Sequence, residues 1–277
     1  MNTKEIQHQI LTRYEKEGRS FPRRTTEDPY AIHICEVMSQ QTQLFRVLPY
    51  RTQRMQDIPD YQTLAKISKT ELLKYRSGLG FNSRALRLQE CARVVVERYG
   101  GKLPQRREEL LQLPGIWPYT ASAICAFAWN QDEAVIDTNI RRVLIFLLKL
   151  PEEISMKELE EVAKKLIPSW RSRDWHNALM DYGAVFLTAK KTKIKSLSKQ
   201  SKFEGSDREV RGWIVKQLVG GSISPLLKGG KGGSWTDWLR IQRIEEEFPH
   251  KNVKEIVQGL VDEGIVEMEG KMIKILE

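Results

Sequence analysis

Apolar residues recur at helical spacing along most of this chain, and short connectors rich in proline and glycine separate the periodic segments. The spacing predicts helices over residues 4–14 and 30–50, and over LRLQECARVVVERYGG, where Gly100 and Gly101 provide the stop. Further helices are expected in RVLIFLLKL, which is too short to span a membrane, and in MKELEEVAKKLIP and WHNALMDYGAVFL. We therefore expect a mainly α-helical fold.

Charge and cysteine usage narrow the kind of protein further. The 277 residues carry a formal net charge of +9, which favours a polyanionic partner such as nucleic acid, although a basic surface without such a partner also accounts for it. Three widely separated cysteines in apolar helical patterns indicate neither a disulfide framework nor a cysteine-ligated metal. With a polar, charged N-terminal stretch and no membrane-length apolar window, we expect a cytoplasmic protein without a membrane partner.

The composition changes near residue 190, where a lysine-rich run without acids extends to Lys202. We interpret this run as a solvated linker, with a contact to nucleic-acid phosphates as the second interpretation. Beyond it, DREVRGWIVKQLV reads as a helix, followed by a helix ending near Phe248, another over residues 251–260, and a strand pair that turns at Gly270. This order predicts a small winged-helix-like domain over residues 201–277, and its mixed charge favours a structural or partner-binding role slightly over base reading.

The stretch LPGIWPYTASAI, residues 113–124, places a glycine-bearing turn directly before a helix start. A helix N-terminus offers unpaired backbone N–H groups and the positive end of the helix dipole, and a glycine turn lets an anion come close. An ordinary connection between two helices has the same local pattern.

Two carboxylates lie in unusual settings. Glu36 belongs to the apolar helical segment PYAIHICEVMSQQTQLF, where burial would disfavour its charged form, although taken alone a surface position on the helix is the simpler interpretation. Asp137 precedes a new helix in AVIDTNIRRVL, where aspartate is a natural N-cap. A pair of acids suits the cleavage of a glycosidic bond, because one can protonate the leaving group while the other stabilises an oxocarbenium-like centre.

Five segments in this order, DPYAIHICEVMSQQTQ, GLGFNSRA, LPGIWPYTASAI, AVIDTNIRRVL and WHNALMDYGA, closely resemble the helix-hairpin-helix (HhH-GPD) base-excision DNA glycosylases, and among them the MutY-like adenine glycosylases. The resemblance covers about residues 20–190. It implies a mainly α fold of two all-α subdomains flanking a DNA cleft, spanning residues 1–200. The hairpin would lie at about residues 110–125, and residues 1–27 and 139–200 would form the second α subdomain.

The resemblance also implies catalytic roles. Glu36 matches the general acid that protonates the adenine ring, and Asp137 matches the carboxylate that stabilises the sugar C1′. Asn139 matches an asparagine that positions the acids or water. Tyr119 stands where strand-cleaving relatives have a Schiff-base lysine, so a monofunctional glycosylase is implied.

The DNA-binding residues are implied in the same way. Arg24 matches an arginine near the target base. Gln41 and Thr42 match contacts to the opposite base, and Leu79 with Phe81 matches the wedge that fills the stack after base flipping. The full implied set is Arg24, Gln40, Gln41, Thr42, Leu79, Phe81, Gly115, Trp117 and Thr120.

Three departures from the family are visible. Trp117 stands where the hairpin usually has a second glycine, and packing against the neighbouring helix is the favoured interpretation of its ring over stacking on DNA. The four cysteines that hold an iron–sulfur cluster in most relatives are missing, so we expect no cluster and no other metal or cofactor; the lysine run either replaces the DNA contact of the cluster loop or is a plain linker. The tail cannot contain the Nudix-like domain that many relatives carry.

The resulting expectation is a monomeric, monofunctional adenine glycosylase acting on double-stranded DNA with adenine opposite guanine or 8-oxoguanine. A thymine or uracil mismatch glycosylase is the enzymatic alternative, and a catalytically inactive DNA-binding protein is the alternative from another class. A strand-cleaving lyase that uses Lys190 or Lys191 is a further alternative.

Overall fold

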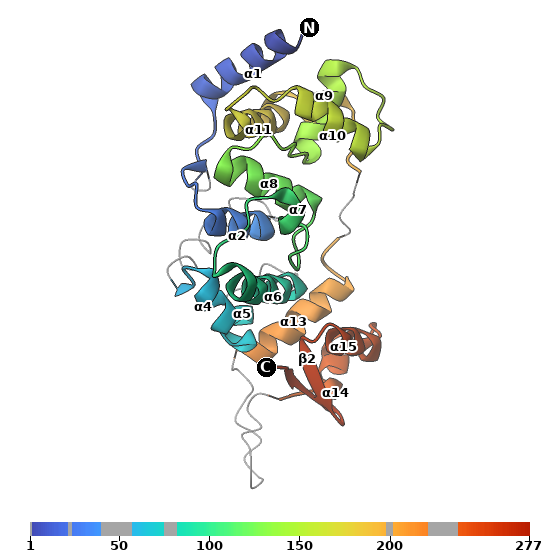
Figure 1. Ribbon diagram of the computed structural model, residues 1–277. Coiled ribbons are helices and arrows are strands. Elements are labelled where there is room, and N and C mark those ends of the chain that lie inside the picture. Colours follow the sequence, from blue (N-terminus) through green and yellow to red (C-terminus); the bar gives the residue numbers. More distant parts are fainter. Residues whose placement is uncertain (1, 22–23, 40–56, 75–81, 198–201, 221–237) are drawn as a thin grey trace. The chain divides into compact units, whose positions relative to one another are not determined.

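The computed structural model describes residues 2–21, 24–39, 57–74, 82–197, 202–220 and 238–277 (Figure 1). Its chain divides into two compact units, residues 1–55 with 102–199 and residues 56–101 with 200–277. The division at residue 200 that the sequence suggested coincides with one of these boundaries. Residues 56–101, however, group with the C-terminal segment, because the helix that follows the lysine run packs on a helix of that range.

All the regular secondary structure in the described residues of the first unit is helical. Its elements are α1 (Thr3–Glu17), α2 (Pro29–Ser39), α7 (Arg107–Leu110), α8 (Pro118–Trp129), α9 (Thr138–Leu148), α10 (Met156–Lys165), α11 (Ser172–Asp181), the π-helical turn η2 (Tyr182–Phe186) and α12 (Ala189–Thr192). In Figure 1, α1 lies beside α11 and α2 lies beside α8, and both pairs are in contact.

The pairing of α2 with α8 forms the centre of this unit. Every residue of α2 from Tyr30 to Met38 is buried, as is every residue of α8 from Thr120 to Ala128. Four of the buried positions of α8 are alanines, whose small side chains allow a close approach of the two helices at interior packing density. The acid Glu36 and the hydroxyl of Tyr119 come from these two helices.

The second unit combines helices with a small sheet. It contains α4 (Tyr61–Lys66), α5 (Lys69–Lys74), α6 (Asn82–Tyr99), α13 (Asp207–Val219), β1 (Leu239–Arg240), α14 (Ile241–Glu247), α15 (Val253–Asp262), β2 (Val266–Glu269) and β3 (Met272–Ile275). The sheet is antiparallel with the order β1-β3-β2, and Ile273 pairs with both Leu239 and Met268.

Most of the expected elements are confirmed. The helix over residues 4–14 is α1, the long periodic segment is α6, and Gly100 and Gly101 end it with φ of 60° and 85°. The helix pair and strand pair of the C-terminal region are α14, α15, β2 and β3, and Gly270 turns between the strands with φ of 59°. A mainly α-helical fold is therefore confirmed.

Some expectations change. The lysine-rich run begins with the one-turn helix α12 and buries Ile194 rather than being solvated throughout. The segment expected as helix over WHNALMDYGAVFL is α11 only to Asp181, and then widens into η2. Among the described helices, none is long and apolar enough to cross a membrane.

Candidate active site

The first pair of site residues joins α2 to α8. Glu36 is buried with 4% of its surface exposed, so its interpretation as a surface position is wrong. Its Oε2 accepts a hydrogen bond of 3.0 Å from the Tyr119 hydroxyl, which stands in the first turn of α8. The hydroxyl therefore fixes the plane of a carboxyl group that is shielded from bulk water.

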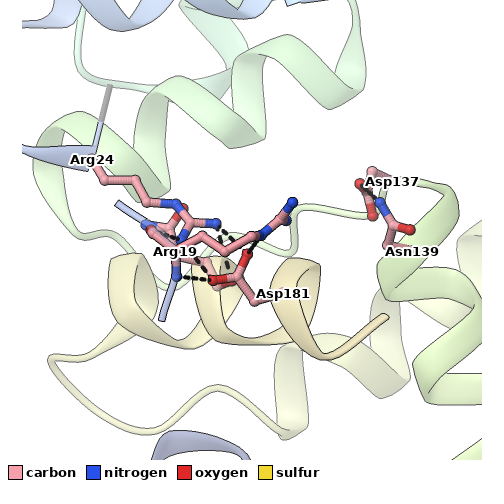
Figure 2. Close-up of polar contacts among 6 residues, drawn as sticks. Arg19, Arg24, Asp137, Asn139 and Asp181 are labelled. Carbon is pink, nitrogen blue, oxygen red and sulfur yellow. Dashed lines mark hydrogen bonds and ion pairs between the residues drawn. The ribbon is translucent and has the colours of Figure 1, made fainter. Parts of the chain in front are cut away.

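The second pair lies at the start of α9. Asp137 is the N-cap, as its residue type predicted: its Oδ1 accepts from the backbone N–H of Ile140 at 2.7 Å. Its Oδ2 accepts from Nδ2 of Asn139 at 3.0 Å. Two N–H donors and the positive end of the α9 dipole thus stabilise negative charge on this carboxylate. The structure brings Asp137 and Asn139 together (Figure 2).

Asn139 is held in turn by residues that the sequence analysis did not select. Arg142 Nη2 donates to Asn139 Oδ1 at 2.7 Å and to the carbonyl of Gly183 at 2.8 Å. Burial lowers the pKa of Arg142, and the charge of Asp137 opposes that shift. A Cβ on Gly183 would come within 2.8 Å of the Asn139 Cβ, so only glycine permits this approach of η2 to α9. The sequence did contain a signal for the role of Arg142, because a charged residue within an apolar helical segment needs a polar partner when it is buried.

A third cluster surrounds Asp181 at the end of α11 (Figure 2). Arg24 binds it bidentately, with both nitrogen–oxygen distances at 2.8 Å, and Arg19 adds bonds from its Nε at 2.6 Å and its backbone N–H at 2.9 Å. Burial alone would raise the pKa of Asp181, but the hydrogen bonds from both arginines outweigh it and lower the pKa below its usual value.

Arg24 is therefore placed against Asp181, a partner that the sequence analysis missed. The exposed fraction of its side chain is only 6%, and its guanidinium also lies 5.1 Å from the ring centre of Phe21. Two buried polar atoms in this cluster, Arg24 Nε and Asn177 Oδ1, have no hydrogen-bond partner among the described residues. Such unsatisfied atoms are rare and need a physical explanation.

The hairpin is formed by α7, the turn after Leu110, and α8. Gly115 has φ of +75°, the left-handed region that favours glycine, as expected for the turn. Trp117 is the N-cap of α8 in extended conformation, with φ of −97° and ψ of 167°, so its position does not need glycine. It exposes 62% of its surface, and packing of its ring against a neighbouring helix is therefore wrong for most of the ring.

The other implied DNA contacts are placed only in part. The side chain of Thr120 is fully buried within α8 and does not face solvent. Gln40, Gln41, Thr42, Leu79 and Phe81 lie outside the described residues.

The segment that follows η2 does not fit an iron–sulfur cluster. A cluster of the family's kind needs four thiolates, whereas the 277 residues contain three cysteines, each buried in a different helix. The segment is instead bound to α9 through its backbone: Arg142 Nε donates to the carbonyl of Leu187 at 2.6 Å, and Arg141 Nη1 donates to that of Lys195 at 3.2 Å. Among the described residues, no group of three or more His, Cys, Asp or Glu side chains could hold a metal ion.

Comparisons with known proteins agree with this fold. The family model described as HhH-GPD superfamily base excision DNA repair protein matches residues 34–169. The adenine DNA glycosylase of Mycolicibacterium smegmatis is 32% identical over 248 residues, which is 82% of this chain and 84% of that protein. The solved structure of a thermostable thymine-DNA glycosylase superposes with a TM-score of 0.66 at 32% identity, covering 68% of this chain and 89% of that one. The chain belongs to the HhH-GPD superfamily of base excision DNA repair proteins.

Within that family, several similar proteins bear one name. The human adenine DNA glycosylase is 40% identical over 192 residues, which is 65% of this chain and 35% of that protein. The chain spans 35 to 42% of the length of the three mammalian adenine DNA glycosylases that it matches. The similarity to these three proteins extends over 65 to 74% of this chain.

Proposed function

We propose that this chain is a monofunctional DNA glycosylase that hydrolyses the N-glycosidic bond of adenine mispaired with guanine or 8-oxoguanine. The observation that carries the proposal is the hydrogen bond from Tyr119 to the buried carboxyl group of Glu36. Tyr119 occupies the position at which a lysine would make the protein a strand-cleaving lyase. The similarity to adenine DNA glycosylases over the same residues supports the choice of base.

The chemistry divides between the two carboxyl groups. Glu36, protonated, donates its proton to a ring nitrogen of the flipped adenine, so that the electron pair of the breaking C1′–N bond is accepted by a neutral leaving base. Asp137, ionised and held by Asn139 and Ile140, stabilises the positive charge that develops at C1′. Water then adds at C1′ and releases a proton to the solvent, which leaves an abasic site.

The hairpin would hold the DNA, and the net charge of +9 would favour its approach. The left-handed Gly115 brings the backbone of the turn to the start of α8, and a phosphate there would meet the positive end of that helix. Arg24 would lie close to the flipped base, with its guanidinium held in place by the carboxylate of Asp181.

The test is single-turnover base release on duplexes with adenine opposite 8-oxoguanine, adenine opposite guanine, thymine opposite guanine and uracil opposite guanine, each with and without hot alkali. Cleavage of the adenine duplexes only after alkali is the expected result. Release of thymine or uracil instead would favour the second candidate, which the similarity to a thymine-DNA glycosylase structure supports. Silence on every duplex would indicate an inactive DNA-binding protein, and strand cleavage without alkali would indicate a lyase.

A further inference from the structure

The segment that leads into Asp137 has no regular secondary structure between residues 130 and 137. The N–H groups of Gln131 and Glu133 donate to the carbonyls of Cys125 and Gln131 at 3.0 and 2.8 Å, but a buried N–H further along the segment needs a partner from another element. Val135, two residues before Asp137, is fully buried, and its N–H donates to Nε2 of His176 on α11 at 3.1 Å. This bond joins residues 41 positions apart in the sequence.

The imidazole of His176 is suited to accept that bond. His176 exposes 1% of its surface, and its Nδ1 lies 2.7 Å from the carbonyl oxygen of Ser172, one turn earlier in α11. A carbonyl oxygen only accepts, so Nδ1 carries the hydrogen and Nε2 keeps a lone pair for Val135. Burial lowers the pKa of His176 to about 4, in agreement with a neutral ring.

The bond gives Asp137 an anchor on its N-terminal side. On the C-terminal side, the carbonyl of Asp137 accepts from Arg141 at 2.9 Å and the carboxylate accepts from Ile140, so that α9 fixes the residue from one direction. Without the bond to His176, residues 130–136 could shift relative to α11 even though Asp137 still capped α9. We infer that His176 is a positioning residue for Asp137, acting through the backbone of Val135 in the reaction proposed above.

His176 does not itself act as an acid or a base in this arrangement. Both of its ring nitrogens are engaged with backbone groups, and the ring is buried among core residues. The effect of replacing it should therefore appear in the rate of base release rather than in DNA affinity. A displacement of about 1 Å at a catalytic group can lower a rate by up to about 10²-fold.

The experiment compares three variants of the full chain. His176→Leu removes the acceptor with little change in volume. His176→Gln keeps an acceptor oxygen at the reach of Nε2. Leu179→Ala, at another buried position of α11, controls for a general loss of packing. For each variant we would measure the single-turnover rate of adenine release, the Kd for the mismatched duplex, and amide hydrogen exchange over residues 131–137.

We expect His176→Leu to release adenine at least about tenfold more slowly with a nearly unchanged Kd, and to exchange the Val135 amide faster. His176→Gln should recover most of the rate and the protection, and Leu179→Ala should retain the parental rate below its unfolding temperature. A parental rate or unchanged exchange in His176→Leu would overturn the inference.

If His176→Leu does not fold, the inference can still be tested with His176→Gln. A folded His176→Gln variant that protects the Val135 amide and yet no longer releases adenine would also overturn it. A parent chain without any base release would instead refute the proposed function.

Discussion

The N-termini of α8 and α9 differ in whether a side chain caps the backbone N–H groups of the first turn. At α8 the cap is Trp117, which makes no side-chain hydrogen bond to the first turn, and Pro118 at the first helical position has no N–H to donate. At α9 the carboxylate of Asp137 accepts directly from Ile140. The dipole at the start of α9 thus acts on a carboxylate of the chain itself, whereas the start of α8 has no carboxylate at its cap position.

In the proposed function, this difference assigns DNA binding to the start of one helix and chemistry to the start of the other. The start of α8 has no charged cap to repel a phosphate, and the first turn also carries Tyr119 toward Glu36. The start of α9 holds a negative charge at a fixed place, with Asn139 and Arg142 behind it. Variants at the two helix starts should consequently separate affinity from rate.

The largest effect is expected for Asp137→Asn. Asparagine caps a helix about as well as aspartate, so the start of α9 should be retained while its charge is lost. We expect the single-turnover rate of adenine release to fall by roughly 10³-fold, because the charge at C1′ loses its stabilising carboxylate. Thermal unfolding and duplex Kd should change little. If the variant released adenine at the parental rate, Asp137 would have no part in the chemistry, and the two helix starts would not differ in function.

The next effect is expected for Glu36→Gln, which cannot protonate the base. We expect a rate loss of roughly 10²-fold, the lower range for removal of a general acid. Tyr119→Phe is the matched variant, because it leaves the acid in place and removes the hydroxyl that donates the bond of 3.0 Å. A net hydrogen bond is worth about 1 kcal/mol, so its rate should fall by about fivefold. Equal losses in the two variants would show that the hydroxyl, and not the proton of Glu36, carries the step.

These two helix starts were visible in the sequence because their signals are local. Asp137 precedes an apolar run as an N-cap does, and Gly115 marks a turn that needs positive φ. Their catalytic meaning came from the resemblance of ordered segments, because distance along the chain says nothing of proximity in space. Periodicity likewise predicted α1 and α6 but not the widening of α11 into η2.

The contacts that support the site were not predictable from local patterns. Asp181 binds Arg24, which lies 157 positions earlier in the chain, and no spacing rule selects that carboxylate among 36 acidic residues. The grouping of residues 56–101 with the C-terminal segment depends on α13 packing on α5, far apart in the chain. Burial of Glu36 also depends on α8, which covers a face that the helical pattern of α2 alone left open.

A smaller effect is expected for Gly115→Ala, which tests the α8 side of the contrast. A Cβ at φ of +75° is strained by about 1–2 kcal/mol, so stability should fall by that amount or the turn should rearrange. We expect the Kd for duplex DNA to rise about fivefold while the single-turnover rate at saturating enzyme stays near the parental value. Gly212→Ala in α13 is the control, since that helical glycine has open space around it and should tolerate a methyl group. A loss of rate without loss of affinity would place the turn in the chemistry.

The smallest effect is expected for Trp117→Ala. The ring is 62% exposed and its backbone is extended, so its removal should change the free energy of unfolding by no more than about 0.5 kcal/mol. No charge is altered, and the dependence of DNA affinity on salt should therefore keep its slope. Fluorescence titration with duplex DNA at several salt concentrations measures both quantities. If the exposed ring stacked on a base, affinity would fall by at least about fivefold, because such stacking is worth about 1–3 kcal/mol. A small change in DNA affinity would instead indicate that the α8 N-terminus differs from the α9 N-terminus through its backbone and dipole, and not through the ring of Trp117.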